Sequence, residues 1–310
     1  MSARGQTIVG AYAIAGGKEG KERLDLLSEA MRATTLELLD SAGLKSGDQC
    51  LDAGCGGGHV ALEMARIVGP TGNVTGIDFD PHVLEFARAD AKEAAAGNVE
   101  FVTADTSGFD GGPFSFIHAR YLLSHVSEPD RVFSRLKRLL APGGRIAIED
   151  IDMSGSFCYP PNSAQDRFQA LYTEAVRHGG ADANLGRRLP ALALAAGLHG
   201  AQWRVFQPLY ASGPHKHMTA VTMQLIGGSL LRYGLATEAE IDTLAQKLRA
   251  FAEIPRRSPL FRASSRFGER LKLAAALAGA ETRGEHFCGK SNETSRFRHA
   301  PVDFGLGIGQ

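Results

Sequence analysis

The chain has 310 residues, and its 34 lysines and arginines are balanced by 34 aspartates and glutamates. A chain of this length can bury a full hydrophobic core, and its balanced charge argues against DNA, tRNA or rRNA as the substrate. The four cysteines lack paired or metal-ligand spacing, so we expect reduced thiols, no metal site and no iron–sulfur cluster. The sequence shows no signal-peptide core and no apolar run of bilayer length, which predicts a soluble, cytoplasmic protein with no membrane partner.

Residues 1–45 combine a glycine-rich segment with one amphipathic helix. The composition of the first twenty residues predicts a mobile segment, and apolar residues then recur at helical spacing from about 21 to 42. Gly43 follows the last apolar turn, at a position where helices commonly end. We therefore expect a separate N-terminal segment and helix.

Between residues 46 and 152, short apolar runs alternate with segments of helical periodicity. We predict strands at 49–53, 73–78, 98–104, 114–121 and 145–151, with helices at 58–68, 81–95 and 130–140. Alternating units of this length form a mostly parallel, doubly wound sheet with helices on both faces. The predicted fold class is α/β, with this region as its core.

The pattern changes after residue 152. Within 153–255 we predict helices near 164–178, 185–196, 217–233 and 238–252 and a sixth strand near 201–210. Residues 256–310 are expected to form a basic helix at 262–280 and then a flexible tail. The alternative for this basic segment is an oligomer contact, such as that of a homodimer.

The most informative motif joins the first strand to the helix that follows it. The strand runs into a glycine cluster that ends at Gly58, and the second strand ends at Asp78, twenty residues further on. Glycines let the backbone approach a ligand closely, and a carboxylate at Asp78 can accept hydrogen bonds from both hydroxyls of a ribose. The motif therefore predicts a nucleoside site.

The spacing of the glycines distinguishes between nucleoside cofactors. A dinucleotide-binding loop would place its third glycine where His59 stands. The sequence instead has the form D-x-G-x-G-x-G, made by Asp52, Gly54, Gly56 and Gly58. This form resembles the first motif of the class I S-adenosylmethionine-dependent methyltransferases.

The resemblance implies a Rossmann-like fold and S-adenosylmethionine as the cofactor. Asp52 and the glycine loop would hold the methionine part of the cofactor, and Asp78 would hold the ribose. Asp105 and Thr106 follow the third strand, where the family has an acid that accepts a hydrogen bond from the adenine amino group; a plain turn cap is the alternative. Phe79 would pack on the adenine, unless it is a core aromatic.

The resemblance also bears on the two ends of the chain. Related enzymes use the N-terminal region as a lid, in which Tyr12 and Arg23 would contact the substrate and the methionine carboxylate. The helices of 153–255 stand where the family usually has a hairpin, so we expect them to cover the substrate site. The family's sheet ends with an antiparallel seventh strand, and no convincing segment for it follows residue 252.

Candidate catalytic residues lie at 120–125, after the fourth strand. This stretch resembles that of methyltransferases that modify quinones and natural products. His125 is the first candidate for a general base because the ordinary pKa of histidine lies near cellular pH; the alternative is that it anchors the next turn. Arg120 would orient an acidic or carbonyl-bearing substrate or contact the cofactor, or else pair with a neighbouring acid. Tyr12 is the third catalytic candidate.

The sequence favours methyl transfer to a small, cyclic or aromatic metabolite by direct displacement, as in natural product or quinone biosynthesis. One alternative is a protein or RNA acceptor that docks on the basic C-terminal segment. Another is a non-catalytic partner subunit that binds the cofactor. The sequence identifies neither the acceptor nor the carbon, oxygen or nitrogen atom that receives the methyl group.

Overall fold

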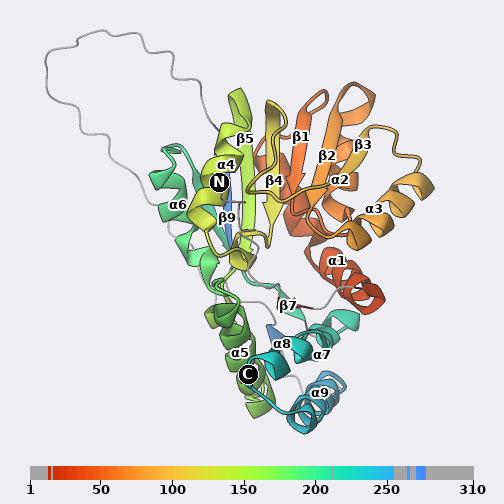
Figure 1. Ribbon diagram of the computed structural model, residues 1–310, viewed down its shortest axis with the longest axis vertical. Helices are drawn as coiled ribbons and strands as arrows, with labels where there is room; N and C mark the ends of the chain where they lie inside the picture. The colour runs from red at the N-terminus through yellow and green to blue at the C-terminus, as the bar shows by residue number, and fades with distance from the viewer. Residues whose placement is uncertain (1–12, 15–16, 211, 255–263, 266–269, 277–310) are drawn as a thin grey trace, which may run out of the picture. The chain divides into compact units, whose positions relative to one another are not determined.

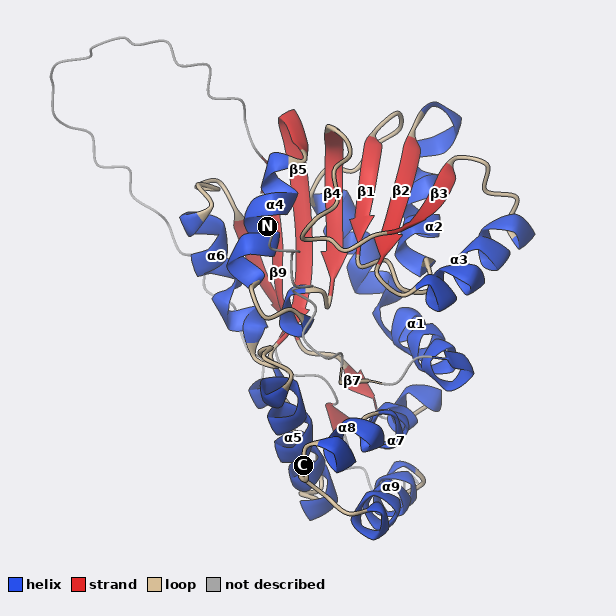
Figure 2. Ribbon diagram, viewed as in Figure 1, coloured by secondary structure: helices blue, strands red, loops and turns tan. Residues whose placement is uncertain are grey.

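The computed structural model describes residues 13–14, 17–210, 212–254, 264–265 and 270–276. Within them, a seven-stranded sheet has the order β3-β2-β1-β4-β5-β9-β6 (Figures 1 and 2). Its strands are β1 (Gln49–Ala53), β2 (Asn73–Asp78), β3 (Val99–Thr103), β4 (Phe114–Arg120), β5 (Leu140–Ile151), β6 (Gln202–Phe206) and β9 (Arg270–Ala276). The first five pair in parallel, which confirms the predicted doubly wound α/β sheet.

Helices follow most of the strands in the order that the periodicity predicts. The described α-helices are α1 (Gly17–Ser41), α2 (His59–Val68), α3 (Pro81–Glu93), α4 (Pro129–Arg138), α5 (Ser163–His178), α6 (Leu189–Ala195), α7 (Met218–Leu225), α8 (Gly227–Arg232) and α9 (Glu238–Ala252). Among these helices, none combines the length and the hydrophobicity that crossing a bilayer requires.

The sheet separates two apolar layers because successive residues of a strand point to opposite faces. In β1, Cys50 packs in the layer that contains residues of α1, α2 and α3, whereas Leu51 packs in the layer that contains residues of α4 and α6. Phe116 and Ile117 of β4 divide between the same two layers. Both faces are therefore covered, as a parallel sheet requires.

A third apolar cluster lies on the carboxyl-end side of the parallel strands. It is formed by α5, α7, α8, α9 and the N-terminal half of α1 (Figure 1). Met31 of α1 and Met223 of α7 are both fully buried in it. These helices therefore have a core of their own, separate from the two layers that flank the sheet.

The prediction of a basic helix at 262–280 is wrong. Residues 264–265 form β8, paired with β7 (Leu209–Tyr210), and β9 runs antiparallel between β5 and β6. The alanines at 274–276 favour a helix in isolation, but backbone groups along β5 and β6 need partners that only a strand between them supplies. In the sequence, leucines alternate with Arg270 and Lys272, which is a strand period that helical propensity concealed.

β9 takes the place of the seventh strand that no segment of the sequence indicated, so it completes the sheet. The predicted tail at 281–310 lies outside the described residues. Three further predicted elements are divided. The helix at 185–196 consists of a 3₁₀ helix, Leu185–Arg188, and α6. The strand at 201–210 consists of β6 and β7, and the helix at 217–233 consists of α7 and α8, where two glycines follow Ile226. Glycine has a low helix propensity, so a break at this point is expected.

We predict that Leu271→Pro, at the second residue of β9, lowers the free energy of unfolding by about 1–3 kcal/mol, because Leu271 pairs with both β5 and β6 and proline removes an N–H donor that a strand carbonyl needs. Urea unfolding followed by circular dichroism measures the change. Leu271→Ile keeps the donor and serves as the control. Equal stability of the two variants would contradict the placement of β9 between β5 and β6.

Candidate functional site

A pocket lies at the carboxyl ends of the parallel strands. The loops after β1, β2, β3 and β4 form part of its wall, and α1 and Tyr172 of α5 contribute to the rest. The predicted site residues that line it are Arg23, Asp52, Gly54, Gly56, Asp78, Phe79, Asp105, Thr106, Arg120 and His125. Of the other two, Gly58 does not line the pocket, and Tyr12 lies outside the described residues.

The glycine loop has a backbone that only glycine adopts readily. Gly54, Gly56 and Gly58 have φ angles of 69°, 52° and 78°, in the left-handed region. A Cβ on Gly58 would lie 2.7 Å from the ring of Phe101 and 2.9 Å from Ala87. Gly58 therefore permits close packing at the start of α2, while Gly54 and Gly56 face the pocket.

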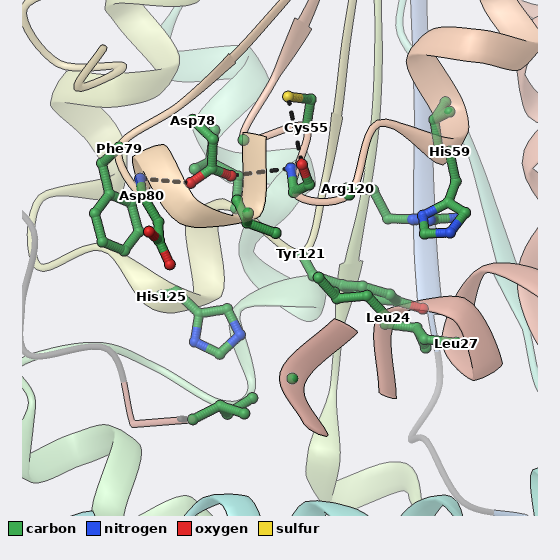
Figure 3. Close-up of a pocket in the computed structure, with 18 of the residues that line it drawn as sticks. Leu24, Leu27, Cys55, His59, Asp78, Phe79, Asp80, Arg120, Tyr121 and His125 are labelled. Atoms are coloured by element: carbon green, nitrogen blue, oxygen red, sulfur yellow. Dashed lines mark hydrogen bonds between the residues drawn. The ribbon is translucent and has the colours of Figure 1, made fainter. Parts of the chain in front are cut away.

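Asp78 ends β2 with its carboxylate tied to the neighbouring backbone. Its Oδ2 accepts a hydrogen bond from the Gly56 N–H at 2.9 Å, and its Oδ1 accepts one from the Asp80 N–H at 3.0 Å (Figure 3). Burial raises the pKa of Asp78, and these backbone hydrogen bonds oppose the rise. Each oxygen keeps a second lone pair, so the carboxylate can still accept hydrogen bonds from ribose hydroxyls.

Asp52 presents a buried acceptor to the pocket. The residue is only 2% exposed and lines the pocket wall. Its Oδ1 lies 2.8 Å from Nδ1 of His118, whereas its Oδ2 is buried with no hydrogen-bond partner among the described residues. A buried carboxylate oxygen of this kind is costly unless a ligand supplies a donor. The ammonium group of a methionine moiety is such a donor, so Asp52 fits the cofactor that the sequence implies.

His118 links Asp52 to a second buried acid. Its Nε2 lies 3.8 Å from Oε1 of Glu149, and that oxygen accepts a hydrogen bond from Thr35 of α1 at 2.5 Å. Burial alone lowers the pKa of His118, but the hydrogen bond to Asp52 and the negative charges of Asp52 and Glu149 raise it above its ordinary value. The charged imidazole is therefore favoured and holds Asp52 in place. The sequence analysis missed His118, because only the pairing of β4 with β1 sets it opposite Asp52.

Phe79 and Asp105 line the part of the pocket where the adenine is expected. Phe79 is 45% exposed, so it is not a core aromatic. Oδ1 of Asp105 accepts a hydrogen bond from the Ser107 N–H at 2.8 Å, which makes Asp105 a turn cap. A carboxylate that caps a turn through one oxygen can still offer its other oxygen to a ligand, so the adenine contact stays a prediction.

His125 lies on a 3₁₀ turn, Leu123–His125, directly after β4. Asp150 accepts a hydrogen bond from the Ser124 N–H at 3.0 Å and so holds this turn. Burial, together with the nearby charge of Arg23, lowers the pKa of His125 to about 3. The imidazole is therefore neutral at cellular pH but weakly basic, which differs from the near-neutral pKa that the sequence analysis assumed.

Tyr121 and Tyr172 are pocket residues that the sequence analysis did not single out. Tyr121 has a φ of 54°, and its N–H donates to the Glu149 carbonyl at 2.9 Å. Left-handed backbone at a non-glycine residue often marks a functional site, and the position of Tyr121 at the end of β4 was a usable signal. Tyr172 of α5 contributes to the apolar lining, together with Leu24 and Leu27 of α1, which Figure 3 labels. No local pattern connects α5 to the site.

Known proteins share the central part of this chain. Residues 44–185 match a family model described as "Methyltransferase domain". The chain is 36% identical over 138 residues to 2-phytyl-1,4-naphtoquinone methyltransferase of Nostoc sp., which covers 43% of this chain and 57% of that protein. It is 32% identical over 158 residues to the ubiquinone/menaquinone biosynthesis C-methyltransferase UbiE of Pseudomonas putida. That alignment covers 49% of this chain and 58% of that protein. The chain thus spans about half the length of the curated relatives it matches.

A solved structure shares the fold. Coclaurine N-methyltransferase bound to N-methylheliamine and S-adenosylhomocysteine aligns with a TM-score of 0.52 and 17% identity, covering 81% of this chain and 71% of that chain. The parallel sheet and the glycine-loop pocket define the class I methyltransferase fold. Residues 44–185 match a methyltransferase domain, in agreement with the resemblance to the class I S-adenosylmethionine-dependent methyltransferases, and the residues of the pocket fit S-adenosylmethionine as the cofactor.

We predict that Asp78→Asn weakens binding of S-adenosylhomocysteine by about 1.5–3 kcal/mol, because charge-assisted hydrogen bonds to the ribose are lost. Isothermal titration calorimetry at neutral pH measures the change. Asp110→Asn is the matched control, since the Asp110 side chain is 94% exposed and lies outside the pocket. Wild-type affinity in Asp78→Asn would remove Asp78 from the cofactor site.

We predict a pH-dependent contribution of His118 to stability. Its folded-state pKa is raised, so the contribution is fully present below the unfolded pKa of about 6.5 and is lost as the pH rises through the folded pKa. The difference in unfolding free energy between wild type and His118→Gln should therefore shrink as the pH rises above this range. Urea unfolding at several pH values measures it, with the exposed His199→Gln as control. A constant difference would contradict the charged imidazole.

Proposed function

We propose that this chain transfers the methyl group of S-adenosylmethionine to a small cyclic or aromatic metabolite, of the kind made in quinone or natural product biosynthesis. The observation that carries the proposal is the mixed lining of one pocket. Acids and a glycine loop that fit the cofactor share it with an apolar wall, two tyrosines and His125. An apolar wall with aromatic side chains suits the flat face of a ring.

Two relatives support a cyclic acceptor. One is named for methylation of a naphthoquinone and the other for ubiquinone and menaquinone biosynthesis. The segment that matches the family model ends at residue 185, before α7, α8 and α9. Because these helices belong to the cluster that packs around α1, we infer that the acceptor of this chain shares the ring of those substrates but differs in its substituents.

The residues of the pocket can align the acceptor and keep water away from it. When bound, S-adenosylmethionine would supply an electrophilic methyl carbon for the acceptor's nucleophile, and S-adenosylhomocysteine would be the leaving group. Tyr121, Tyr172 and Leu27 hold the ring of the acceptor, since orientation and exclusion of water are the main needs of such a reaction. His125 accepts a hydrogen bond from the acceptor's hydroxyl or amine. With a pKa of about 3, it orients this group more than it removes its proton.

An assay with S-adenosylmethionine labelled on its methyl group tests the proposal. The purified chain is incubated with a panel of hydroquinones, phenols and aromatic amines, and we expect labelled product from at least one compound together with equimolar S-adenosylhomocysteine. Cofactor binding with label transfer only to protein or RNA would favour a macromolecular acceptor. Binding without any transfer would favour a non-catalytic subunit, and no binding would overturn the proposal.

We predict that His125→Ala lowers kcat by about 10- to 1,000-fold, at or below the usual contribution of general base catalysis, with unchanged affinity for S-adenosylhomocysteine. Because the imidazole is already neutral, wild-type kcat should show no titration step from His125 between about pH 5 and 8. Steady-state kinetics across this range measure both effects. A step near pH 6.5 that disappears in the variant would contradict the neutral imidazole, and unchanged kcat would leave His125 as an anchor of its turn.

A further inference from the structure

Within the described residues, the guanidinium groups of Arg23 and Arg120 line the pocket without a direct ion pair, although Thr35 links Arg120 to the buried acid Glu149. Lys21, another cation of the wall, pairs with Asp25 at 2.9 Å and with Asp90 at 3.3 Å. Neither Arg23 nor Arg120 forms an ion pair with a carboxylate in the described part of the chain. A guanidinium group stays charged at every physiological pH, and burying it without an anion is costly. The pocket therefore calls for anions from its ligands.

Arg120 lies on the cofactor side of the pocket. It ends β4, which pairs with β1 up to the start of the glycine loop, and its Nη1 donates to Oγ1 of Thr35 at 3.3 Å. Figure 3 shows Arg120 beside His59, the first residue of α2. Burial is the main cause that lowers the pKa of His59, and the charge of Arg120 contributes to this shift. The carboxylate of a methionine moiety held by Asp52 and the loop would meet Arg120 here.

Arg23 lies on a different wall, against the helices. The residue is 5% exposed, and its Nε donates to Oγ1 of Thr222 on α7 at 3.0 Å. The Thr222 hydroxyl donates in turn to the Met218 carbonyl at 2.7 Å, so α7 holds the guanidinium in one orientation. The charge of Arg23 also acts on His125. Arg23 is thus fixed between a helix of the outer cluster and the residue proposed to orient the acceptor.

The cofactor carries one carboxylate, so it can neutralise only one of two guanidinium groups on separate walls. We propose that Arg23 binds an anionic group of the methyl acceptor, and that the acceptor is therefore a ring that carries a carboxylate. A planar guanidinium held at Nε presents its remaining N–H groups as a fork that matches a carboxylate. Ile14, Leu27 and Tyr172 provide apolar surface for the ring. This inference rests on the methyl transfer proposed above.

The family resemblance implies that Arg23 contacts the substrate or the methionine carboxylate of the cofactor, and a first experiment separates these two roles. S-adenosylhomocysteine and 5′-methylthioadenosine differ in that the latter lacks the amino acid group. We expect Arg120→Gln to weaken the binding of S-adenosylhomocysteine by at least about tenfold and to leave the affinity for 5′-methylthioadenosine unchanged. Arg23→Gln should change neither affinity. Selective loss of S-adenosylhomocysteine binding in Arg23→Gln would overturn the proposal.

A second experiment tests the anion directly. Benzoate and its neutral isostere benzamide are titrated by ligand-observed NMR into the protein saturated with S-adenosylhomocysteine. We expect benzoate to bind more tightly than benzamide. Arg23→Gln should weaken the binding of benzoate by at least about tenfold and leave the affinity for benzamide unchanged. Arg23→Lys keeps the positive charge but loses the forked pair of N–H donors, so its affinity for benzoate should lie between those of wild type and Arg23→Gln. Thr222→Val removes the hydroxyl that accepts the hydrogen bond from Nε of Arg23, and its affinity for benzoate should also be intermediate.

The matched control is Arg32→Gln, because Arg32 stands on the same helix, pairs with Glu63 and does not line the pocket. It should bind both probes as wild type does. Equal binding of benzoate and benzamide, or no saturable benzoate binding to the wild-type complex, would overturn the proposal. In either case binding of S-adenosylhomocysteine and methyl transfer would still stand, so this failure is distinct from failure of the proposed function. Retained S-adenosylhomocysteine affinity in each Arg23 variant shows that its pocket is folded.

Discussion

The parallel register of β1, β2 and β4 is the constraint on which the site depends. Because these strands run in the same direction, their carboxyl ends meet at one edge of the sheet. Asp52, Asp78 and Arg120 reach that edge from three separate strands, although they are far apart in the sequence. The same register sets His118 opposite Asp52, so the buried imidazole hydrogen-bonds the carboxylate that lines the pocket.

The pocket contains charged groups that the described part of the chain leaves incompletely neutralised, and our proposal for its ligands depends on them. One buried oxygen of Asp52 and the buried guanidinium group of Arg23 would each cost stability in an empty fold, and the guanidinium group of Arg120 is partly buried. Such groups are retained where a ligand supplies the missing partners. Here Asp52 would pair with one cation, and Arg23 and Arg120 would each pair with an anion. A zwitterionic methionine moiety supplies one of each, which leaves one anion to be brought by the acceptor.

Residues 44–185 and the helices that follow them contribute different residues to the site. The segment that matches the methyltransferase domain, 44–185, contains the glycine loop, Asp78 and the turn that carries His125. The helices beyond it add a separate apolar cluster and hold Arg23 through Thr222. If the proposals above hold, the residues for cofactor binding lie in the segment shared with the relatives, and those for recognition of the acceptor depend on helices that this match does not include.

The sequence by itself determined the features that local patterns encode. A strand, three spaced glycines and an acid after the next strand specify the cofactor loop, because each depends on backbone conformation and periodicity over a few tens of residues. Tertiary structure decided the rest. β9 is a strand because β5 and β6 need a partner, His125 is neutral because burial and Arg23 act on it, and Tyr172 reaches the pocket because α5 packs there. Burial and cross-strand pairing join residues from distant parts of the chain, and no local period records them.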